Sequence, residues 1–63
     1  MKIPKRKLEI IMAKMEMSTS DIIQRGMPRP TLDRIKATES AKPETVGKLA
    51  KILGCDVTDL LED

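Results

Sequence analysis

Apolar residues recur along the chain with the spacing of an amphipathic α-helix. Those from Leu8 to Met15 fall at positions i, i+3, i+4 and i+7, and those from Val46 to Leu53 repeat the pattern. The segment that begins at Val57 shows its first half. No sustained run alternates apolar and polar residues as a half-buried strand does. The pattern therefore predicts an all-α protein.

Capping residues and prolines divide this pattern into five short helices. Ser18 is followed three residues later by Asp21, and Asp56 by Asp59, which is the spacing of a capping box with a short carboxylate. Proline suits the first turn of a helix, so Pro43 is expected to open one. A chain of this length holds one domain, so residues 1–63 are expected to form a single compact bundle. Its helices are predicted at about residues 5–15, 19–25, 30–37, 43–53 and 57–62.

The second and third helices are joined by a short link that contains Gly26 and Met27. Gly26 is expected to end the second helix in the left-handed conformation that glycine adopts at helix ends. Arg29 precedes Pro30 and is biased away from helical angles, so we expect Arg29 as N-cap and Pro30 as the first helical residue. A link of about four residues with a glycine is typical of the helix-turn-helix motif. Residues 38–42 are then predicted to form a loop.

The apolar faces of the helices are expected to meet in one core. The chain has five methionines and no aromatic residue, and the flexible thioether can fill irregular gaps in place of rings. Cys55 is interpreted as a further small apolar residue of this core. The main members predicted are Leu8, Ile11, Met15, Ile22, Met27, Leu32, Ile35, Val46, Leu49, Leu53, Val57 and Leu60.

Charge is distributed unevenly along the chain. Residues 1–42 carry ten Lys or Arg and five Asp or Glu, a balance of +5, whereas residues 43–63 carry two and five, a balance of −3, which together give the net +2. A basic amino-terminal two-thirds indicates one surface that meets an anion. The absence of aromatic residues removes the stacking platforms of single-strand and RNA binders but leaves recognition of duplex DNA open.

Composition disfavours several other classes of function. Histidine is absent, and no metal-ligand spacing, phosphate-binding glycine loop or catalytic triad is present, so we expect no enzyme, cofactor or metal site. Cys55 is the only cysteine, which excludes an internal disulfide and favours a reducing compartment. Neither a membrane span nor a signal peptide is expected. We expect a cytoplasmic protein of a bacterium, or of a phage or mobile-element host.

The order of these signals resembles the Cro/phage-repressor type of helix-turn-helix protein, the XRE family. The resemblance runs over residues 8–61 and is carried by MSTSDII at residues 17–23, GMPRPTLDRI at residues 26–35 and the stretch 42–61. The last stretch is the most specific, because it is similar to the P-x-T-V-x-K-I-A-K-A-L-G-V-x-V-x-x-L ending of short regulators in this family. The resemblance implies a five-helix, lambda-repressor-like DNA-binding domain.

Four departures from the family pattern bear on the site. The link between Ile23 and Gly26 is one residue shorter than usual, and Thr19 stands where glutamine is common. An arginine of the first helix and an acid of the third, which often pair, are Met12 and Lys36 in this chain. Their replacement predicts an apolar contact with an exposed lysine, or no contact at all. The glycine that commonly follows the third helix is missing.

The motif implies that the third helix enters the major groove with its amino-terminal residues at base edges. Arginine can bond O6 and N7 of guanine, a threonine methyl group can meet thymine, and a carboxylate can accept from cytosine N4. The carboxylate of Asp33 has the alternative of holding an arginine in place. The predicted base contacts are Arg29, Thr31, Asp33 and Arg34.

Phosphate contacts are expected on both flanks of that helix. The start of the second helix offers hydroxyl groups beside free N–H groups and a positive dipole end, and the loop after the third helix is basic. The predicted phosphate contacts are Ser18, Thr19, Lys36, Thr38, Ser40 and Lys42. A charge cluster at a terminus is usually solvated, and a DNA-binding arm is the alternative for Lys2, Lys5, Arg6 and Lys7.

Two functions are compatible with this pattern. The favoured one is sequence-specific binding of double-stranded DNA by a homodimer, as a small transcriptional regulator of repressor type, with no membrane partner and no small-molecule substrate. The alternative is an antitoxin-like or adaptor module that binds protein. A positive stripe of Arg29, Arg34 and the loop lysines would favour DNA. An exposed apolar patch of Met12, Met17 and Ile23 would favour a protein partner.

Overall fold

The computed structural model describes residues 1–61, and within them it contains five α-helices and no strand. The all-α fold expected from the periodicity is therefore confirmed. The molecule measures 27 × 23 × 18 Å along its principal axes. Over the described residues, every helix is too short or too polar to cross a bilayer. The helices are α1 (Lys5–Lys14), α2 (Thr19–Gln24), α3 (Arg29–Thr38), α4 (Pro43–Leu53) and α5 (Val57–Leu60).

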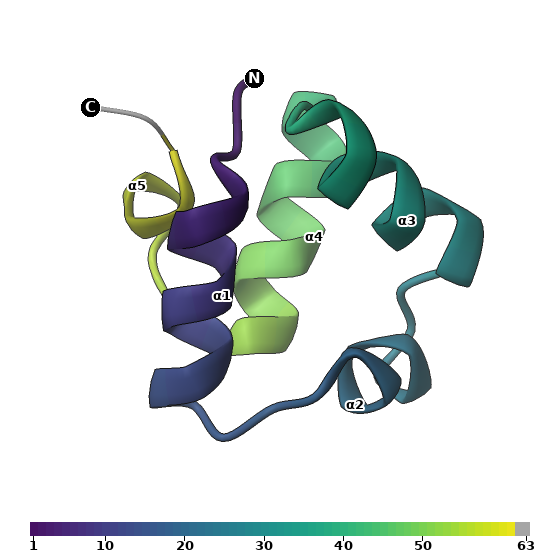
Figure 1. Cartoon of the computed structure of the whole chain (residues 1–63), viewed down its shortest axis with the longest axis vertical. Coiled ribbons are helices and arrows are strands. Elements are labelled where there is room, and N and C mark those ends of the chain that lie inside the picture. Colours follow the sequence, from purple (N-terminus) through teal and green to yellow (C-terminus); the bar gives the residue numbers. More distant parts are fainter. Residues whose placement is uncertain (62–63) are drawn as a thin grey trace.

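The helix α4 occupies the middle of the bundle (Figure 1). Helices α1 and α5 lie on one side of it, and α2 and α3 lie on the other. The short α5 packs against both α1 and α4. An extended segment before α1 forms an isolated antiparallel bridge, in which Lys2 pairs with Ser40. The α2–α3 pair thus lies on one side of α4, and α1 and α5 lie on the other.

The core is built from the inward faces of all five helices. Most of the residues predicted for the core are buried. The predicted burial of Met15 was wrong, because α1 ends at Lys14 and the Met15 side chain is 45% exposed. Val57 is only half-buried. Two buried residues, Ile3 and Ala50, were not predicted. The buried apolar residues are Ile3, Leu8, Ile11, Ile22, Met27, Leu32, Ile35, Val46, Leu49, Ala50, Leu53 and Leu60.

The helices begin at or close to the residues predicted from the capping pattern, and one prediction, the N-cap of α3, is corrected. Both capping boxes form, one between Ser18 and Asp21 and the other between Asp56 and Asp59. The N-cap of α3 is Pro28 rather than Arg29, which adopts helical angles as the first residue of α3 despite the proline that follows it. Pro30 stays within the first turn, where its missing N–H costs nothing.

Helix ends differ from the sequence prediction by one or two residues. Gly26, which was expected at a helix end, has a positive φ of 115°, and Gly54, the C-cap of α4, has a positive φ of 73°. The helix α3 continues to Thr38, so the loop that was expected from residue 38 begins one residue later. The last helix ends at Leu60, two residues short of the predicted Glu62, which lies outside the described residues.

The Asp21 cap predicts a measurable dependence of stability on pH. Hydrogen bonds from the backbone N–H and the hydroxyl group of Ser18 hold the pKa of Asp21 below its ordinary value of 3.8. A carboxyl group whose pKa is lowered by folding stabilises the fold above its unfolded pKa, and this contribution is lost as pH falls through the folded pKa. We expect Asp21→Ala to lower the free energy of unfolding at pH 7 and to have a smaller effect at pH 2, measured by urea denaturation.

The matched control for this prediction is Asp33→Ala. Asp33 is also an exposed helical aspartate, but its carboxylate forms no hydrogen bond or ion pair within residues 1–61. The control should change stability to a similar extent at both pH values. If Asp21→Ala shows the same pH profile as wild type, the capping box does not act through the ionised carboxylate.

Candidate nucleic-acid interface

The α2–α3 pair has the form of a helix-turn-helix motif. Its link, Arg25–Pro28, has four residues, as predicted. Gly26 adopts its positive φ in this link, and the Met27 side chain is 1% exposed. The buried Met27 side chain therefore anchors the turn to the core and helps to fix the orientation of α3 relative to α2. Leu32 and Ile35 anchor α3 itself, since both are buried.

The four predicted base contacts lie on the part of α3 that is not fully buried. Arg29, Asp33 and Arg34 are exposed, and Thr31 is half-buried. Within residues 1–61 the two guanidinium groups form no hydrogen bond and no ion pair, and Asp33 does not pair with either. The alternative in which Asp33 holds an arginine in place is therefore not realised here. Five donors on each arginine remain open to an acceptor.

Two predicted phosphate contacts from different helices meet at the start of α2. The Lys36 ammonium group donates a hydrogen bond of 2.6 Å to the Thr19 hydroxyl oxygen. The expectation of an exposed lysine at this position was wrong, because Lys36 lies across the gap to α2 and is half-buried. The Thr19 hydroxyl accepts this bond and keeps its own proton, so it can still donate. This pair places a positive charge and a free donor together beside α3.

Two other predicted phosphate contacts are already engaged within the chain. The Ser18 hydroxyl group donates to Asp21 Oδ2 at 3.0 Å and accepts from the Asp21 N–H at 3.1 Å. The Thr38 hydroxyl group donates to the Arg34 carbonyl at 2.8 Å, one turn back in α3. A hydroxyl group has one proton to donate, so neither is free for a phosphate oxygen.

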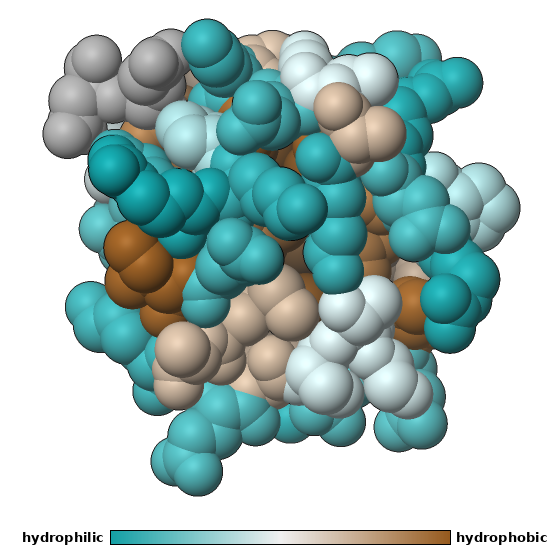
Figure 2. All heavy atoms as spheres, in the orientation of Figure 1, coloured by the Kyte–Doolittle hydropathy of each residue, from teal (hydrophilic) through white to brown (hydrophobic). Residues whose placement is uncertain are grey.

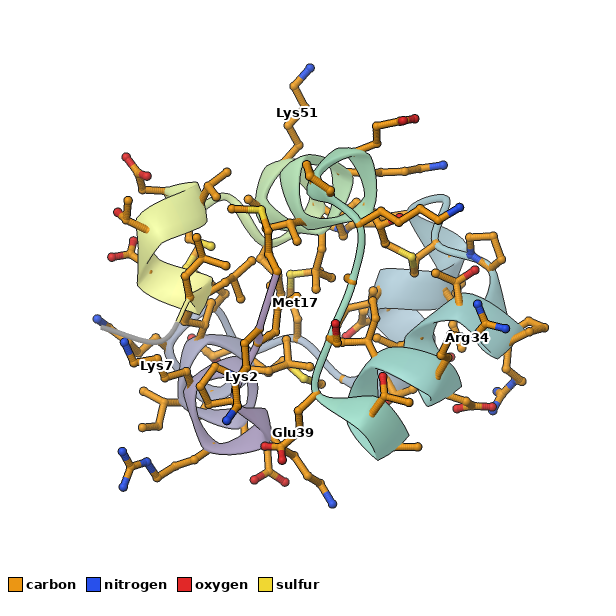
Figure 3. All side chains as sticks on the ribbon, turned by 90° about the horizontal axis from the view of Figure 1, so that it is seen from above. Lys2, Lys7, Met17, Arg34, Glu39 and Lys51 are labelled. Atoms are coloured by element: carbon orange, nitrogen blue, oxygen red, sulfur yellow. The ribbon has the colours of Figure 1, made fainter. Side chains whose placement is uncertain are left out.

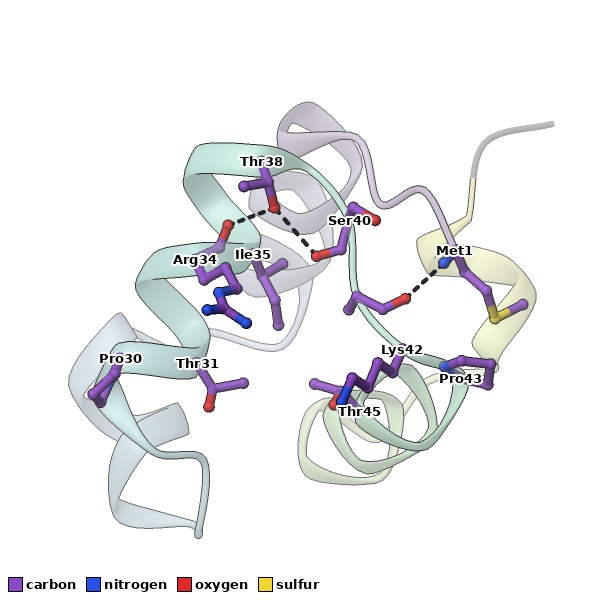
Figure 4. Close-up of a pocket in the computed structure, with 11 residues that line it drawn as sticks. Met1, Pro30, Thr31, Arg34, Ile35, Thr38, Ser40, Lys42, Pro43 and Thr45 are labelled. Carbon is purple, nitrogen blue, oxygen red and sulfur yellow. Dashed lines mark hydrogen bonds between the residues drawn. The ribbon is translucent and has the colours of Figure 1, made fainter.

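A hollow of about 880 Å³ lies between α3 and the start of α4 (Figure 4). Arg34 and Lys42 supply positive charges at its wall, and among residues 1–61 no carboxylate lines it. Its remaining polar lining includes the hydroxyl groups of Thr31, Thr38, Ser40 and Thr45. Sequence analysis did not select Thr45, although its place in the first turn of α4, three residues after Lys42, was a usable signal. An anion is the ligand that such a lining suits.

The basic residues near the amino terminus do not form a free arm. The Ile3 side chain is fully buried, and its N–H group donates to the Glu39 carbonyl at 2.8 Å. The amino group of Met1 donates to the Ala41 carbonyl at 2.6 Å (Figure 4). The Lys7 ammonium group donates to the Leu61 carbonyl at 2.7 Å. Residues 1–3 are therefore docked along the loop between α3 and α4, whereas Lys5, Arg6 and Lys7 belong to α1.

The apolar patch that would favour a protein partner is not present in the expected place. Met12, Met17 and Ile23 are half-buried and pack against the core. The large apolar side chains that are exposed include Ile10, at 51%, and Met15. Figure 2 shows a largely hydrophilic face with separate apolar patches. This arrangement favours DNA binding over the alternative of a module that binds protein.

A second hollow borders these exposed residues between α1 and α5. Its lining includes Ile10, Met15 and Cys55. Burial raises the pKa of the Cys55 thiol, and the nearby Asp59 carboxylate adds to the effect. A raised pKa keeps the thiol protonated and unreactive, so Cys55 acts as a small, half-buried apolar residue, as interpreted from the sequence.

Comparison with known proteins agrees with this geometry. No curated protein and no solved structure gives a significant match to the chain. The model of one family, the Cro/C1-type HTH DNA-binding domain, matches residues 7–63. The match covers all five helices except the first two residues of α1. The chain therefore belongs to the Cro/C1-type family of helix-turn-helix DNA-binding domains.

Proposed function

We propose that this chain is a sequence-specific transcriptional regulator of repressor type, which inserts α3 into the major groove of double-stranded DNA. The observation that carries the proposal is the open, positively charged surface beside α3. Arg34 and Lys42 line a hollow to which no residue of the described part of the chain contributes a carboxylate, and Arg29 is exposed at the start of α3. Recognition helices of this kind place their amino-terminal residues at base edges.

The proposed base contacts are made by the outward side of α3. The guanidinium groups of Arg29 and Arg34 can each form the bidentate bond to guanine, and the donors needed are free within the described residues. The methyl group of Thr31 can meet thymine, and the Asp33 carboxylate can accept from cytosine. These four side chains read sequence, whereas the contacts beside them set the position of the helix.

The proposed phosphate contacts lie on two flanks of α3. Thr19 and Lys36 form one flank through their hydrogen bond, and Ser40 and Lys42 form the other at the edge of the hollow. Ser18 and Thr38 belong to these flanks as well, but their hydroxyl protons are used inside the chain. We therefore propose that Ser18 and Thr38 hold the flanks in shape, while the other four side chains meet the backbone of the duplex.

A homodimer on a palindromic site completes the proposal. A single module of this size contacts one short stretch of groove, and two-fold dimers of this motif read half-sites about 34–36 Å apart. Residues 1–63 would act as one non-catalytic domain in the cytoplasm of a bacterium, or of a phage or mobile-element host. Two chains per bound duplex, measured by sedimentation of the complex, is the expected stoichiometry.

The test of this function is binding of the purified protein to its own promoter region and to random duplex, over a series of salt concentrations. Preference for one site, with the logarithm of affinity falling linearly in the logarithm of salt, is the expected result. Equal, weak binding to every duplex would contradict the proposal. It would favour the antitoxin-like or adaptor alternative, with the exposed apolar residues Ile10 and Met15 as the first surface to probe.

Removal of one proposed phosphate contact should weaken binding to all sequences alike. Lys42→Ala is expected to reduce the magnitude of the salt slope by about 1 for each bound chain, because one fewer counterion is released. Preference among base sequences should remain. The matched control is Lys51→Ala, since Lys51 is exposed on α4 and points away from the bundle on a different side from Arg34 (Figure 3). A Lys42→Ala slope equal to that of Lys51→Ala would remove Lys42 from the interface.

A further inference from the structure

We propose that residues 1–3 and the Glu39 side chain form a positioning element for DNA binding, which holds the Ser40–Lys42 loop against the end of α3. The inference rests on the proposed function, because that loop supplies one of the two phosphate-binding flanks. Neither residues 1–3 nor Glu39 is among the proposed DNA contacts. They act through the loop, by limiting the conformations that it can adopt before DNA arrives.

Backbone hydrogen bonds tie residues 1–3 to the loop on both sides of Ser40. The Ile3 N–H group donates to the Glu39 carbonyl at 2.8 Å, and the Ala41 N–H group donates to the Met1 carbonyl at 2.9 Å. Between them, Lys2 and Ser40 form an antiparallel bridge. The loop therefore has the backbone pairing of a short strand, although it belongs to an all-helical protein.

The fully buried Ile3 side chain fixes this segment to the core. The short pairing of residues 1–3 with residues 39–41 would be marginally stable by itself in water. Burial of the Ile3 side chain supplies the apolar contact that the hydrogen bonds lack. The loop is thus held by an anchor that reaches the same core as Leu32 and Ile35 of α3.

Glu39 connects three parts of the chain. It is the C-cap of α3 and has a φ of 54°, in the left-handed region where glycine is the usual residue. Its carbonyl accepts from Ile3, and its carboxylate accepts from the Lys5 N–H group at 2.8 Å. Lys5 begins α1, whose N-cap Pro4 offers no side-chain hydrogen bond. Glu39 therefore caps α1 from the end of α3 (Figure 3).

This connection explains why a carboxylate stands at a position that favours glycine. Glycine at residue 39 would relax the left-handed backbone but would remove the cap on α1 and the side-chain link to residues 1–5. The backbone of Glu39 is strained by its positive φ, and in return the hydrogen bonds of Glu39 hold the loop in place. If fixing the loop serves DNA binding, loss of the link should be visible in affinity even where stability is unchanged.

The test compares Glu39→Gly with Glu39→Gln on the duplex that the wild type prefers. Both variants remove one negative charge, so their general electrostatic effect on DNA is matched, but only glutamine keeps a side-chain oxygen that can accept from Lys5. We expect Glu39→Gly to bind roughly two- to tenfold more weakly than Glu39→Gln, the range expected for one hydrogen bond between neutral groups. Its salt slope should also be smaller by about 1 for each chain.

Two further measurements separate positioning from folding. Thermal unfolding followed by circular dichroism identifies a temperature at which both variants are fully folded. DNA binding of the two variants is then compared at that temperature. Amide hydrogen exchange should show faster exchange at Ala41 in Glu39→Gly, with exchange at the core residue Leu49 unchanged. Faster exchange confined to Ala41, together with weaker binding, is the expected result.

Three outcomes would overturn the inference. In the first, the two variants bind with the same affinity and slope while the wild type still prefers its site. In the second, Ala41 exchange does not change. In the third, Glu39→Gly fails to fold at any temperature, which would make Glu39 a folding contact of the whole domain. A wild type without any site preference would instead contradict the proposed function, so the two failures are distinguishable.

Discussion

Leu32→Ala is expected to remove a large part of the free energy of unfolding of this protein. The Leu32 side chain is fully buried on the inner side of α3, and a leucine-to-alanine change in such a place costs about 2–5 kcal/mol. A domain of this size has a total stability of about 3–9 kcal/mol, from the usual 0.05–0.15 kcal/mol per residue. One substitution can therefore remove a large part of this stability, and any fraction of the protein that unfolds would not bind DNA.

The measurement is thermal unfolding followed by circular dichroism. Leu32→Ala should lower Tm by more than about 10 °C, since each kcal/mol shifts Tm by about 4–8 °C in a domain of this size. Leu32→Met, which conserves volume, should cost less than about 1.5 kcal/mol. Ile10→Ala is the control at an exposed site, because Ile10 is 51% exposed, and its Tm should change little. A fall of only a few degrees for Leu32→Ala would show that the cavity collapses or fills.

Helix positions and most of the core were predictable because both depend on neighbours in sequence. The buried side of a helix repeats every three to four residues, and this spacing identified core residues such as Leu8 and Leu49. The capping boxes at Ser18 and Asp56 were predictable for the same reason, since each involves residues three apart. Met15 is the predicted core residue that is exposed, because it keeps the helical spacing but lies just past the last turn of α1.

Contacts between distant parts of the chain were not predictable in this way. Ile3 has no periodic partner in sequence, and it is buried because residues 1–3 pair with the loop after α3. At the end of the third helix, the sequence showed only that the glycine common in the family is missing, and residue 39 is a glutamate instead. Its second role, the cap on α1 thirty-four residues earlier in the chain, depends on how the two helices pack.

The candidate site was predictable as a set of residue types, whereas the state of each donor was not. Arg29 and Arg34 follow from the motif and its register alone. Sequence could not show that the hydroxyl protons of Ser18 and Thr38 are used within the chain. Nor could it show that Lys36 crosses to Thr19. These facts come from side-chain geometry, and they reduce six predicted phosphate contacts to four with free donors.

The arginines of α3 are expected to govern which DNA sequence is bound. Arg29→Ala and Arg34→Ala should each reduce discrimination between the preferred site and a single base-pair mismatch by about 1–3 kcal/mol, or roughly 5–150-fold in relative affinity. Both side chains are exposed and form no hydrogen bond within residues 1–61, so the fold should be unaffected. The measurement is competition binding against a panel of singly substituted duplexes.

Lysine variants separate base reading from phosphate binding at each position. Arg29→Lys and Arg34→Lys keep the positive charge but lose the planar fork that matches guanine bidentately. If both arginines read bases, the lysine variants should retain the salt slope and lose discrimination at one base pair each. Arg34 shares its hollow with Lys42. If Arg34→Lys kept full discrimination while Arg34→Ala lowered the slope, Arg34 would belong with Lys42 among the phosphate contacts, and Arg29 alone would carry base recognition by arginine.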